Sequence, residues 1–262
     1  MIKYNGKEVT LNHFPDGTLL VKETVADTDR AVITWLYENN EEMVALYFLT
    51  KHLQAKDVKE IALELPYIPN ARQDRVKASE DVFTLKYFAE FINGLGFSEV
   101  TVLDPHSYVS EALFDHLKIR TPKCYVEQVL EKLGTKENVL LFFPDEGAMK
   151  RYSSMFELPY VFGIKKRNWT NGEILGLDVT GRTELIKGST VLIVDDICSR
   201  GGTFYHSAKA LKELGASKVY LYISHCENTI LGGEILTTDL IGKVYTTNSI
   251  FTKQHEKIEV LA

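Results

Sequence analysis

The segment that decides the fold reads Val191-Leu192-Ile193-Val194-Asp195-Asp196-Ile197-Cys198-Ser199-Arg200-Gly201-Gly202-Thr203. Its first four residues are apolar and predict a buried strand, which runs into two carboxylates. Small residues follow and open a predicted helix at about 204–214. A strand, a glycine-containing loop and a helix in this order are typical of parallel α/β sheets, in which the helix N-terminus offers an anion site.

Each part of this segment has a chemical use. The two glycines let backbone N–H groups approach a phosphate closely, and the helix N-terminus adds a partial positive charge. Ser199 and Thr203 can donate hydrogen bonds to phosphate oxygens, and Asp195 and Asp196 can accept ribose hydroxyls or hold a Mg²⁺-bound sugar. The plainer interpretation is a strand end followed by a tight turn, which suits an isolated Gly-Gly better than the complete arrangement.

Short apolar strands and amphipathic helices alternate along most of the chain. The pattern predicts strands at 61–65, 100–104, 139–143, 191–194 and 218–224, and helices at 83–95, about 110–117 and about 204–214. Such alternation predicts an α/β fold of mostly parallel sheets covered by helices on both faces. The pattern breaks near residues 118–137. We therefore predict an N-terminal domain over 1–127 and a C-terminal domain over 128–243, with the tail 244–262 packed on the first.

Length and composition exclude several classes of protein. With 262 residues, of which 45% are hydrophobic and 25% charged, the chain can form one large or two ordinary domains. A formal net charge of −6 argues against a general nucleic-acid binder, which needs a basic face. Cys124, Cys198 and Cys226 show no metal-type spacing and suit a reducing compartment. Because neither a signal-peptide pattern nor a bilayer-spanning run is found, we expect a cytoplasmic protein that binds neither nucleic acid nor membrane.

A second segment, Tyr67-Ile68-Pro69-Asn70-Ala71-Arg72-Gln73-Asp74-Arg75, directly follows the predicted strand 61–65. Arg72 offers a forked donor for phosphate oxygens, and Gln73 offers paired amide groups. Such a charged run is more often a solvated surface loop. Its place after a strand end, where ligands bind in open α/β sheets, favours a binding role.

Together, the two segments resemble the ribose-phosphate diphosphokinase (PRPP synthetase) family, which has the type I phosphoribosyltransferase fold. Residues 191–203 are similar to the PRPP-binding motif that phosphoribosyltransferases share, and residues 67–75 are similar to an ATP-binding stretch of the synthetases. The resemblance implies two phosphoribosyltransferase-like domains, each a mostly parallel sheet flanked by helices. Motifs in the family's order cover nearly the whole chain, from about Phe14 to about Ser249.

Shorter matches extend the resemblance. Leu103-Asp104-Pro105-His106-Ser107 is similar to a Mg²⁺–ATP segment, and Pro144-Asp145-Glu146-Gly147 to a turn whose acid contacts metal or ribose. Residues 163–168 match a catalytic loop with two cations, here Lys165 and Arg167. Phe14-Pro15-Asp16-Gly17 is similar to a stretch that binds adenine across a subunit interface.

The resemblance implies a role for each matched residue. The catalytic residues would be Lys165, Arg167 and His106, and the metal would lie near Asp104, His106 and Asp145. ATP would be bound by Phe14, Asp16, Arg72, Gln73, Asp74, Arg75 and His106. The ribose phosphate would be bound by Asp195, Asp196, Ser199, Arg200, Gly201, Gly202 and Thr203.

The implied reaction transfers diphosphate from ATP, with Mg²⁺ as cofactor, to the anomeric hydroxyl of ribose 5-phosphate and gives PRPP and AMP. Adenine recognition between subunits implies at least a homodimer. Two departures from the family stand out: Thr18 replaces the usual Glu beside adenine, and Ser199-Arg200 replaces the usual Asp-Thr in the sugar-phosphate loop. The second exchanges an acid for a guanidinium, so a larger acceptor such as ADP-ribose, in NAD salvage, stays open. Further alternatives are a PRPP-consuming phosphoribosyltransferase and a non-catalytic synthetase-associated subunit.

Overall fold

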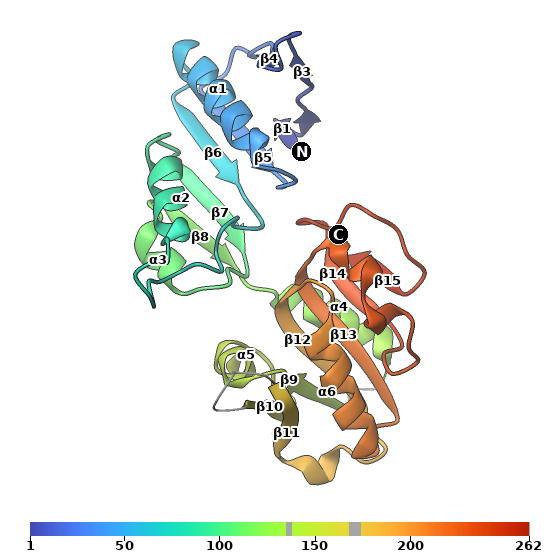
Figure 1. Ribbon diagram of the computed structural model, residues 1–262. Coiled ribbons are helices and arrows are strands. Elements are labelled where there is room, and N and C mark those ends of the chain that lie inside the picture. The colour runs from blue at the N-terminus through green and yellow to red at the C-terminus, as the bar shows by residue number, and fades with distance from the viewer. Residues whose placement is uncertain (135–137, 168–173, 262) are drawn as a thin grey trace. The chain divides into compact units, whose positions relative to one another are not determined.

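The computed structural model describes residues 1–134, 138–167 and 174–261, and side chains are not described for 165–167 and 174–176. The chain divides into two compact units, Met1–Thr121 and Pro122–Ala262 (Figure 1). The boundary lies after Thr121 rather than after residue 127, because helix α4 (Lys123–Leu133) buries Val126 and Val129 in the second unit. Among the described residues, no helix is long and apolar enough to cross a membrane.

The first unit is built on one mixed sheet. Its strands lie in the order β2 (Lys7–Glu8), β1 (Ile2–Tyr4), β5 (Arg30–Trp35), β6 (Glu60–Glu64), β7 (Glu99–Leu103) and β8 (Leu117–Arg120). Strands β5 to β8 are parallel, while β1 pairs antiparallel with β2 and β5. Helices α1 (Glu41–Ala55), α2 (Thr84–Asn93) and α3 (Val109–Leu113) connect the parallel strands, and β3 (Leu11–His13) and β4 (Leu19–Val21) form a separate hairpin.

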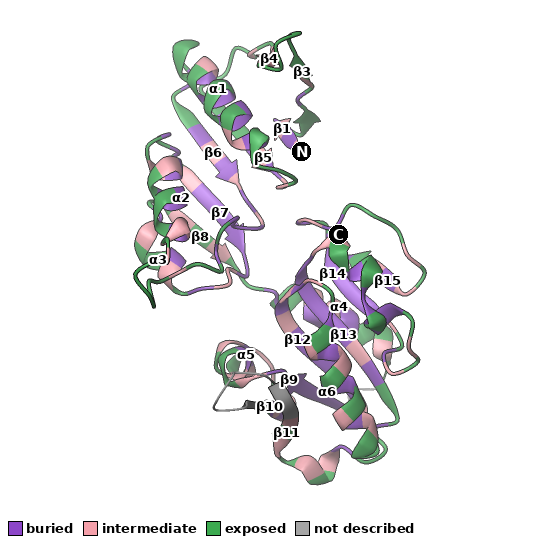
Figure 2. Ribbon diagram, in the orientation of Figure 1, coloured by how far each residue is buried: buried purple, intermediate pink, exposed green. Residues whose placement is uncertain are grey.

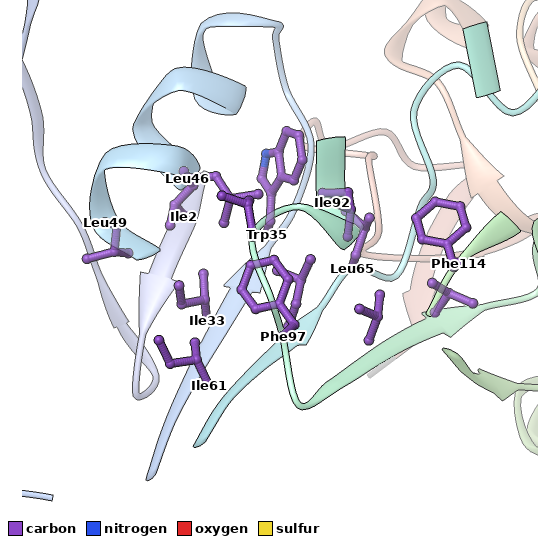
Figure 3. Close-up of a cluster of buried hydrophobic side chains, with 14 of the residues drawn as sticks. Ile2, Ile33, Trp35, Leu46, Leu49, Ile61, Leu65, Ile92, Phe97 and Phe114 are labelled. Atoms are coloured by element: carbon purple, nitrogen blue, oxygen red, sulfur yellow. The ribbon is translucent and has the colours of Figure 1, made fainter. Parts of the chain in front are cut away.

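One face of this sheet carries the apolar core. Figure 3 shows Ile33 and Trp35 of β5 gathered with Leu46 of α1 and Ile61 of β6. Helix α1 accordingly has a buried and an exposed side (Figure 2). On β5 the burial alternates, as the period of two requires, and the opposite face carries polar groups such as Arg30, whose Nε lies 2.8 Å from a Glu60 carboxylate oxygen. The alternation is found on β5 and β6, whereas on β7 the residues from Val100 to Leu103 are all buried, so both faces are covered there.

The second unit contains a seven-stranded sheet that is mostly parallel. Its order is β11 (Ile174–Gly181), β10 (Tyr160–Arg167), β9 (Val139–Phe143), β12 (Thr190–Cys198), β13 (Lys218–Cys226), β14 (Val244–Thr247) and β15 (Ile258–Leu261). In the described part of this sheet, β11 pairs antiparallel with β10 and the other neighbours pair in parallel. The helices are α4, α5 (Glu146–Tyr152) and α6 (Gly202–Glu213), with short 3-10 turns η2 (Ser153–Met155), η3 (Thr183–Leu185), η4 (Asn228–Gly232) and η5 (Glu234–Leu236).

Both faces of this second sheet are buried. Leu140 and Phe142 of β9 belong to a cluster that includes residues of α6, whereas Leu141 and Phe143 belong to a cluster that includes residues of α4 and α5. Such central parallel strands need apolar residues at every position, which explains the unbroken Val139–Phe143 run. The predicted cover on both faces is confirmed for this sheet.

Three boundary predictions need correction. The tail belongs to the second unit rather than to the first, because β14 and β15 extend the second sheet next to β13. Strand β12 continues through both acids to Cys198, since β13 pairs with it as far as Cys198 opposite Cys226. Helix α3 ends at Leu113, because the chain from Leu117 is taken up by β8.

Candidate active site

The glycine-containing loop lies between β12 and α6, as the sequence predicts. Gly201 is the N-cap of α6 and has φ +81°, a conformation that L side chains rarely adopt. A Cβ added there would lie 2.7 Å from Cγ2 of Ile235. Helix α6 begins at Gly202, so Thr203 lies in its first turn and its first N–H groups point toward the loop that holds Ser199. This arrangement can hold an anion such as a phosphate.

A second chain segment, residues 227–235, packs against this loop. The backbone N–H of Glu227 donates to the carbonyl of Cys198 at 2.8 Å. A Cβ added to Gly233 would overlap the carbonyl oxygen of Arg200 and lie 2.9 Å from its carbonyl carbon. Nothing lies within 4 Å of a Cβ added to the neighbouring Gly232. The backbone of residues 227–235 thus contacts the loop closely, and Gly233 permits the approach.

Two acids occupy the last part of β12. Asp196 is 5% exposed, and its backbone N–H donates to Oδ1 of Asp195 at 3.0 Å. Loss of solvent, followed by the negative charges of Asp196 and Asp145, raises the pKa of the Asp195 carboxyl well above its usual range. The three carboxylates therefore gather where the neighbouring strands β9 and β12 end.

Asp145 also has a local structural role. It is the N-cap of α5, and its Oδ1 accepts a hydrogen bond from the backbone N–H of Ala148 at 3.1 Å. Among the residues that the structure describes, no group of three or more His, Cys, Asp and Glu side chains is arranged to hold a metal ion. The metal contacts expected of Asp104, His106 and Asp145 thus stay predictions.

In the first unit, the segment 67–75 and the segment 103–107 follow neighbouring strands. β6 and β7 are parallel, and the N–H of Leu103 donates to the carbonyl of Pro66 at 3.0 Å just beyond the ladder. Arg72 and Gln73 are exposed, His106 is half-buried, and Asp104 is buried with φ +40°. The two segments that sequence analysis connected with ATP are therefore adjacent at one edge of this sheet.

Asp74 links these two segments directly. Its carboxylate accepts two hydrogen bonds from Arg75, from Nε at 2.6 Å and from Nη2 at 2.8 Å, and a third from the Ser107 hydroxyl at 2.7 Å. Arg75 is the main cause that lowers the pKa of Asp74 to about 2, and Ser107 adds to it. Asp74 therefore connects the two loops, and its expected contact with ATP stays a prediction.

A pH-dependent contribution to stability follows from this carboxylate. Because the folded pKa lies below the unfolded value of about 3.9, stabilisation by ionised Asp74 is present above about pH 4 and is lost as the pH falls toward 2. We expect Asp74→Asn to lower the melting temperature at pH 7 by up to about 2–4 °C, and the difference from wild type to vanish near pH 2. Thermal melts from pH 7 to pH 2 test this, and a difference independent of pH would contradict it.

The segment Phe14-Pro15-Asp16-Gly17 forms the turn between β3 and β4. The N–H of Gly17 donates to the carbonyl of Phe14 at 2.9 Å, and Gly17 has φ +84°. Thr18 donates to the Asp16 carboxylate from its hydroxyl at 2.7 Å and from its backbone at 3.0 Å, which lowers the pKa of Asp16. Turn geometry thus explains Pro15, Asp16 and Gly17. It does not explain Phe14, an aromatic residue that is 49% exposed.

Lys165 and Arg167 lie on β10, which pairs antiparallel with β11 and has a register shift between Lys166 and Arg167. Their side chains fall outside the described part of the chain, as does residue 168. The expected catalytic loop is thus the arm of a β-hairpin in this structure.

Three residues that sequence analysis missed contribute to these sites. Ser107 holds Asp74, Gly233 permits the backbone of 227–235 to approach Arg200, and Arg151 of α5 has Nη1 3.1 Å from Oδ2 of Asp196. Each acts through a contact with a residue distant in sequence. Ser107 stands in the matched segment 103–107 and Arg151 lies on the helix that follows the Asp145 turn, so both positions offered a signal in the sequence, whereas Gly233 offered none.

Comparisons with known proteins agree with this geometry. Residues 2–96 match the N-terminal domain of ribose phosphate pyrophosphokinase, and residues 128–240 match the phosphoribosyl transferase domain. The chain is 31% identical to a ribose-phosphate pyrophosphokinase from Thermococcus kodakarensis over 226 residues, which cover 83% of this chain and 77% of that protein. A ribose-phosphate pyrophosphokinase from Sulfolobus acidocaldarius is 29% identical, with coverage of 90% and 82%.

The fold is also shared with a solved structure. Phosphoribosylpyrophosphate synthetase from Mycobacterium smegmatis superimposes with a TM-score of 0.79 at 20% identity, covering 97% of this chain and 85% of that one. The predicted fold class, two mostly parallel sheets flanked by helices, is confirmed. From its sequence relatives and its two domains, the chain belongs to the ribose-phosphate pyrophosphokinase family.

Proposed function

We propose that this protein transfers the diphosphate of ATP to the anomeric hydroxyl of ribose 5-phosphate and so makes PRPP and AMP. The observation that carries the proposal is the presence, in one chain, of two half-sites with different chemistry. One follows β6 and β7 and holds Arg and Gln side chains suited to a triphosphate, and the other follows β12 and suits a sugar phosphate. Membership of the family supports the same reaction.

In the proposed reaction the anomeric oxygen attacks the β-phosphorus of ATP and loses its proton. The bond from that phosphorus to the oxygen shared with the α-phosphate breaks, and AMP leaves. The ribose hydroxyls would lie on Asp195 and Asp196, with the 5-phosphate at the N-terminus of α6. Arg72, Gln73 and His106 would contact the triphosphate. Positioning and neutralisation of charge would supply most of the rate.

Mg²⁺ fits the available donors. This ion keeps several waters and usually takes one or two protein carboxylates together with substrate phosphates, so a cluster of three ligands is not needed. Asp104 and His106 would contribute to holding a Mg²⁺ ion in the first unit, and Asp145 would offer a carboxylate to one in the second unit. When bound with ATP, it would neutralise charge on the phosphate oxygens.

Adenine would be bound by Phe14 and Asp16, in an assembly of at least two copies. The exposure of Phe14 at the tip of the β3–β4 hairpin supports this, because an aromatic ring there is available to stack on a base. Thr18 already occupies one oxygen of Asp16, so the hairpin presents this carboxylate in a fixed orientation.

Arg200 favours a second acceptor. It is exposed, in a loop whose backbone is held against Gly233, so its guanidinium can reach beyond a 5-phosphate. The same transfer onto a diphosphate-linked ribose such as ADP-ribose is therefore the second candidate function.

The test is a quenched reaction of the purified protein with ATP, Mg²⁺ and either ribose 5-phosphate or ADP-ribose, scored for AMP by chromatography. We expect AMP and PRPP with ribose 5-phosphate, and no AMP after chelation of the metal. AMP with ADP-ribose alone would move the acceptor and retain the chemistry. No AMP with either acceptor would contradict the proposal and favour a non-catalytic subunit, whereas release of diphosphate from PRPP with a base and without ATP would indicate a transferase.

A further inference from the structure

An ion pair joins α5 to the acids of β12. Nη1 of Arg151 lies 3.1 Å from Oδ2 of Asp196, and the two side chains are only 16% and 7% exposed. Asp196 belongs to the proposed ribose site, whereas Arg151 comes from the helix that starts after β9. The pair is therefore shielded from water and connects two neighbouring strand ends.

The Arg151 guanidinium is held in place by contacts with Tyr152. Its Cζ lies 5.6 Å from the centre of the Tyr152 ring, and Nη1 also donates to the Tyr152 hydroxyl at 3.4 Å. Tyr152 is fully buried, and its ring lies 6.1 Å from that of Phe143 at the end of β9. The position of the arginine is thus set by the core of the second unit.

We propose that Arg151 is a positioning residue, which holds the Asp196 carboxylate in the orientation that binds the ribose of the acceptor; this rests on the proposed function. A bidentate-capable, planar guanidinium restricts the carboxylate more than a flexible ammonium does. With one carboxylate oxygen bound by Arg151, rotation of the Asp196 side chain is limited before the sugar arrives.

The negative charges around Asp196 also favour a positioning role for Arg151. Asp145 follows β9, the strand beside the part of β12 that leads to Asp195 and Asp196. A sugar phosphate is itself an anion, so three carboxylates without a cation would repel it. Arg151 offsets part of this charge through its ion pair with Asp196.

Kinetics of three variants test the proposal. Arg151→Met removes the guanidinium, Arg151→Lys keeps the charge without the fork, and Lys150→Met is the matched control. Lys150 is the preceding residue on the same helix, but its side chain is 67% exposed and its ammonium pairs with Glu146 at 2.9 Å. AMP formation is measured with ribose 5-phosphate varied at saturating ATP and with ATP varied at saturating acceptor. Calorimetry measures ribose 5-phosphate binding directly.

We expect Arg151→Met to raise the KM and the dissociation constant for ribose 5-phosphate by about tenfold or more, with the KM for ATP within about twofold. Arg151→Lys should restore part of the loss, and Lys150→Met should match wild type. Equal changes in both KM values, or no change in acceptor affinity, would overturn the proposal. If Arg151→Met does not fold, Arg151→Lys decides alone. Wild-type protein that binds ribose 5-phosphate but makes no AMP would count against the proposed function, while the calorimetric comparison still tests Arg151.

Discussion

Replacement of Lys165 and Arg167 together with alanine should reduce turnover by about 10³-fold or more, the range found for cations that stabilise a transferring phosphoryl group. Both residues lie on β10, the first arm of the β10–β11 hairpin. During diphosphoryl transfer, negative charge spreads over the transferring group and the leaving side. Cations that meet this charge only in the transition state lower the barrier without strengthening substrate binding.

The measurement is kcat by quenched AMP formation, together with calorimetric affinities for ribose 5-phosphate and an ATP analogue. We expect kcat to collapse while both dissociation constants change less than about threefold. Lys166→Ala is the matched control. Lys166 lies between the two residues on the same strand, and the family resemblance gives it no catalytic role. Turnover of the double variant within about tenfold of wild type would remove these residues from the mechanism.

Much of the fold could be predicted because local chemistry decides it. The run Val139–Phe143 has no polar position and can only be a strand buried on both faces, and it was found at the predicted residues. The same reasoning placed the strand before Asp195 and the helix after Gly202. It failed at the ends of elements, where distant partners decide. Strand β12 passes through both acids because β13 continues beside it, which the sequence of β12 alone does not contain.

Some residues of the candidate site could likewise be predicted from the sequence, and others could not. Residues that would touch substrate, such as Asp195 and Arg72, are predictable because their chemical type and their place after a strand identify them. Residues that hold those groups are not, because their partners are distant in sequence: Ser107 reaches Asp74, and Arg151 reaches Asp196. The tail 244–262 was assigned to the wrong unit for a related reason. Its short apolar segments could pair with any open sheet edge, and in the structure β14 pairs with β13.

A single added methyl group at Gly233 should reduce kcat/KM for the acceptor by about 100-fold, because a displacement of about 1 Å in a binding loop can have an effect of this size. The backbone at Gly233 has φ −97° and ψ 150°, which alanine adopts without strain. The obstacle is steric alone. The new Cβ would overlap the carbonyl oxygen of Arg200 and lie 3.1 Å from the carbonyl oxygen of Ile230, so either the phosphate loop or its support must move.

The neighbouring Gly232→Ala variant is a close control, because its Cβ meets nothing within 4 Å. We expect Gly232→Ala to match wild type in acceptor kcat/KM and in melting temperature. Gly233→Ala should fold with a loss of about 1–3 kcal/mol, as for other overpacked sites, and should retain the KM for ATP, whose half-site lies in the other unit. If the two alanine variants have the same acceptor kcat/KM, the close approach of residues 227–235 does not set the geometry of the phosphate loop, and the helix N-terminus of α6 alone must account for acceptor binding.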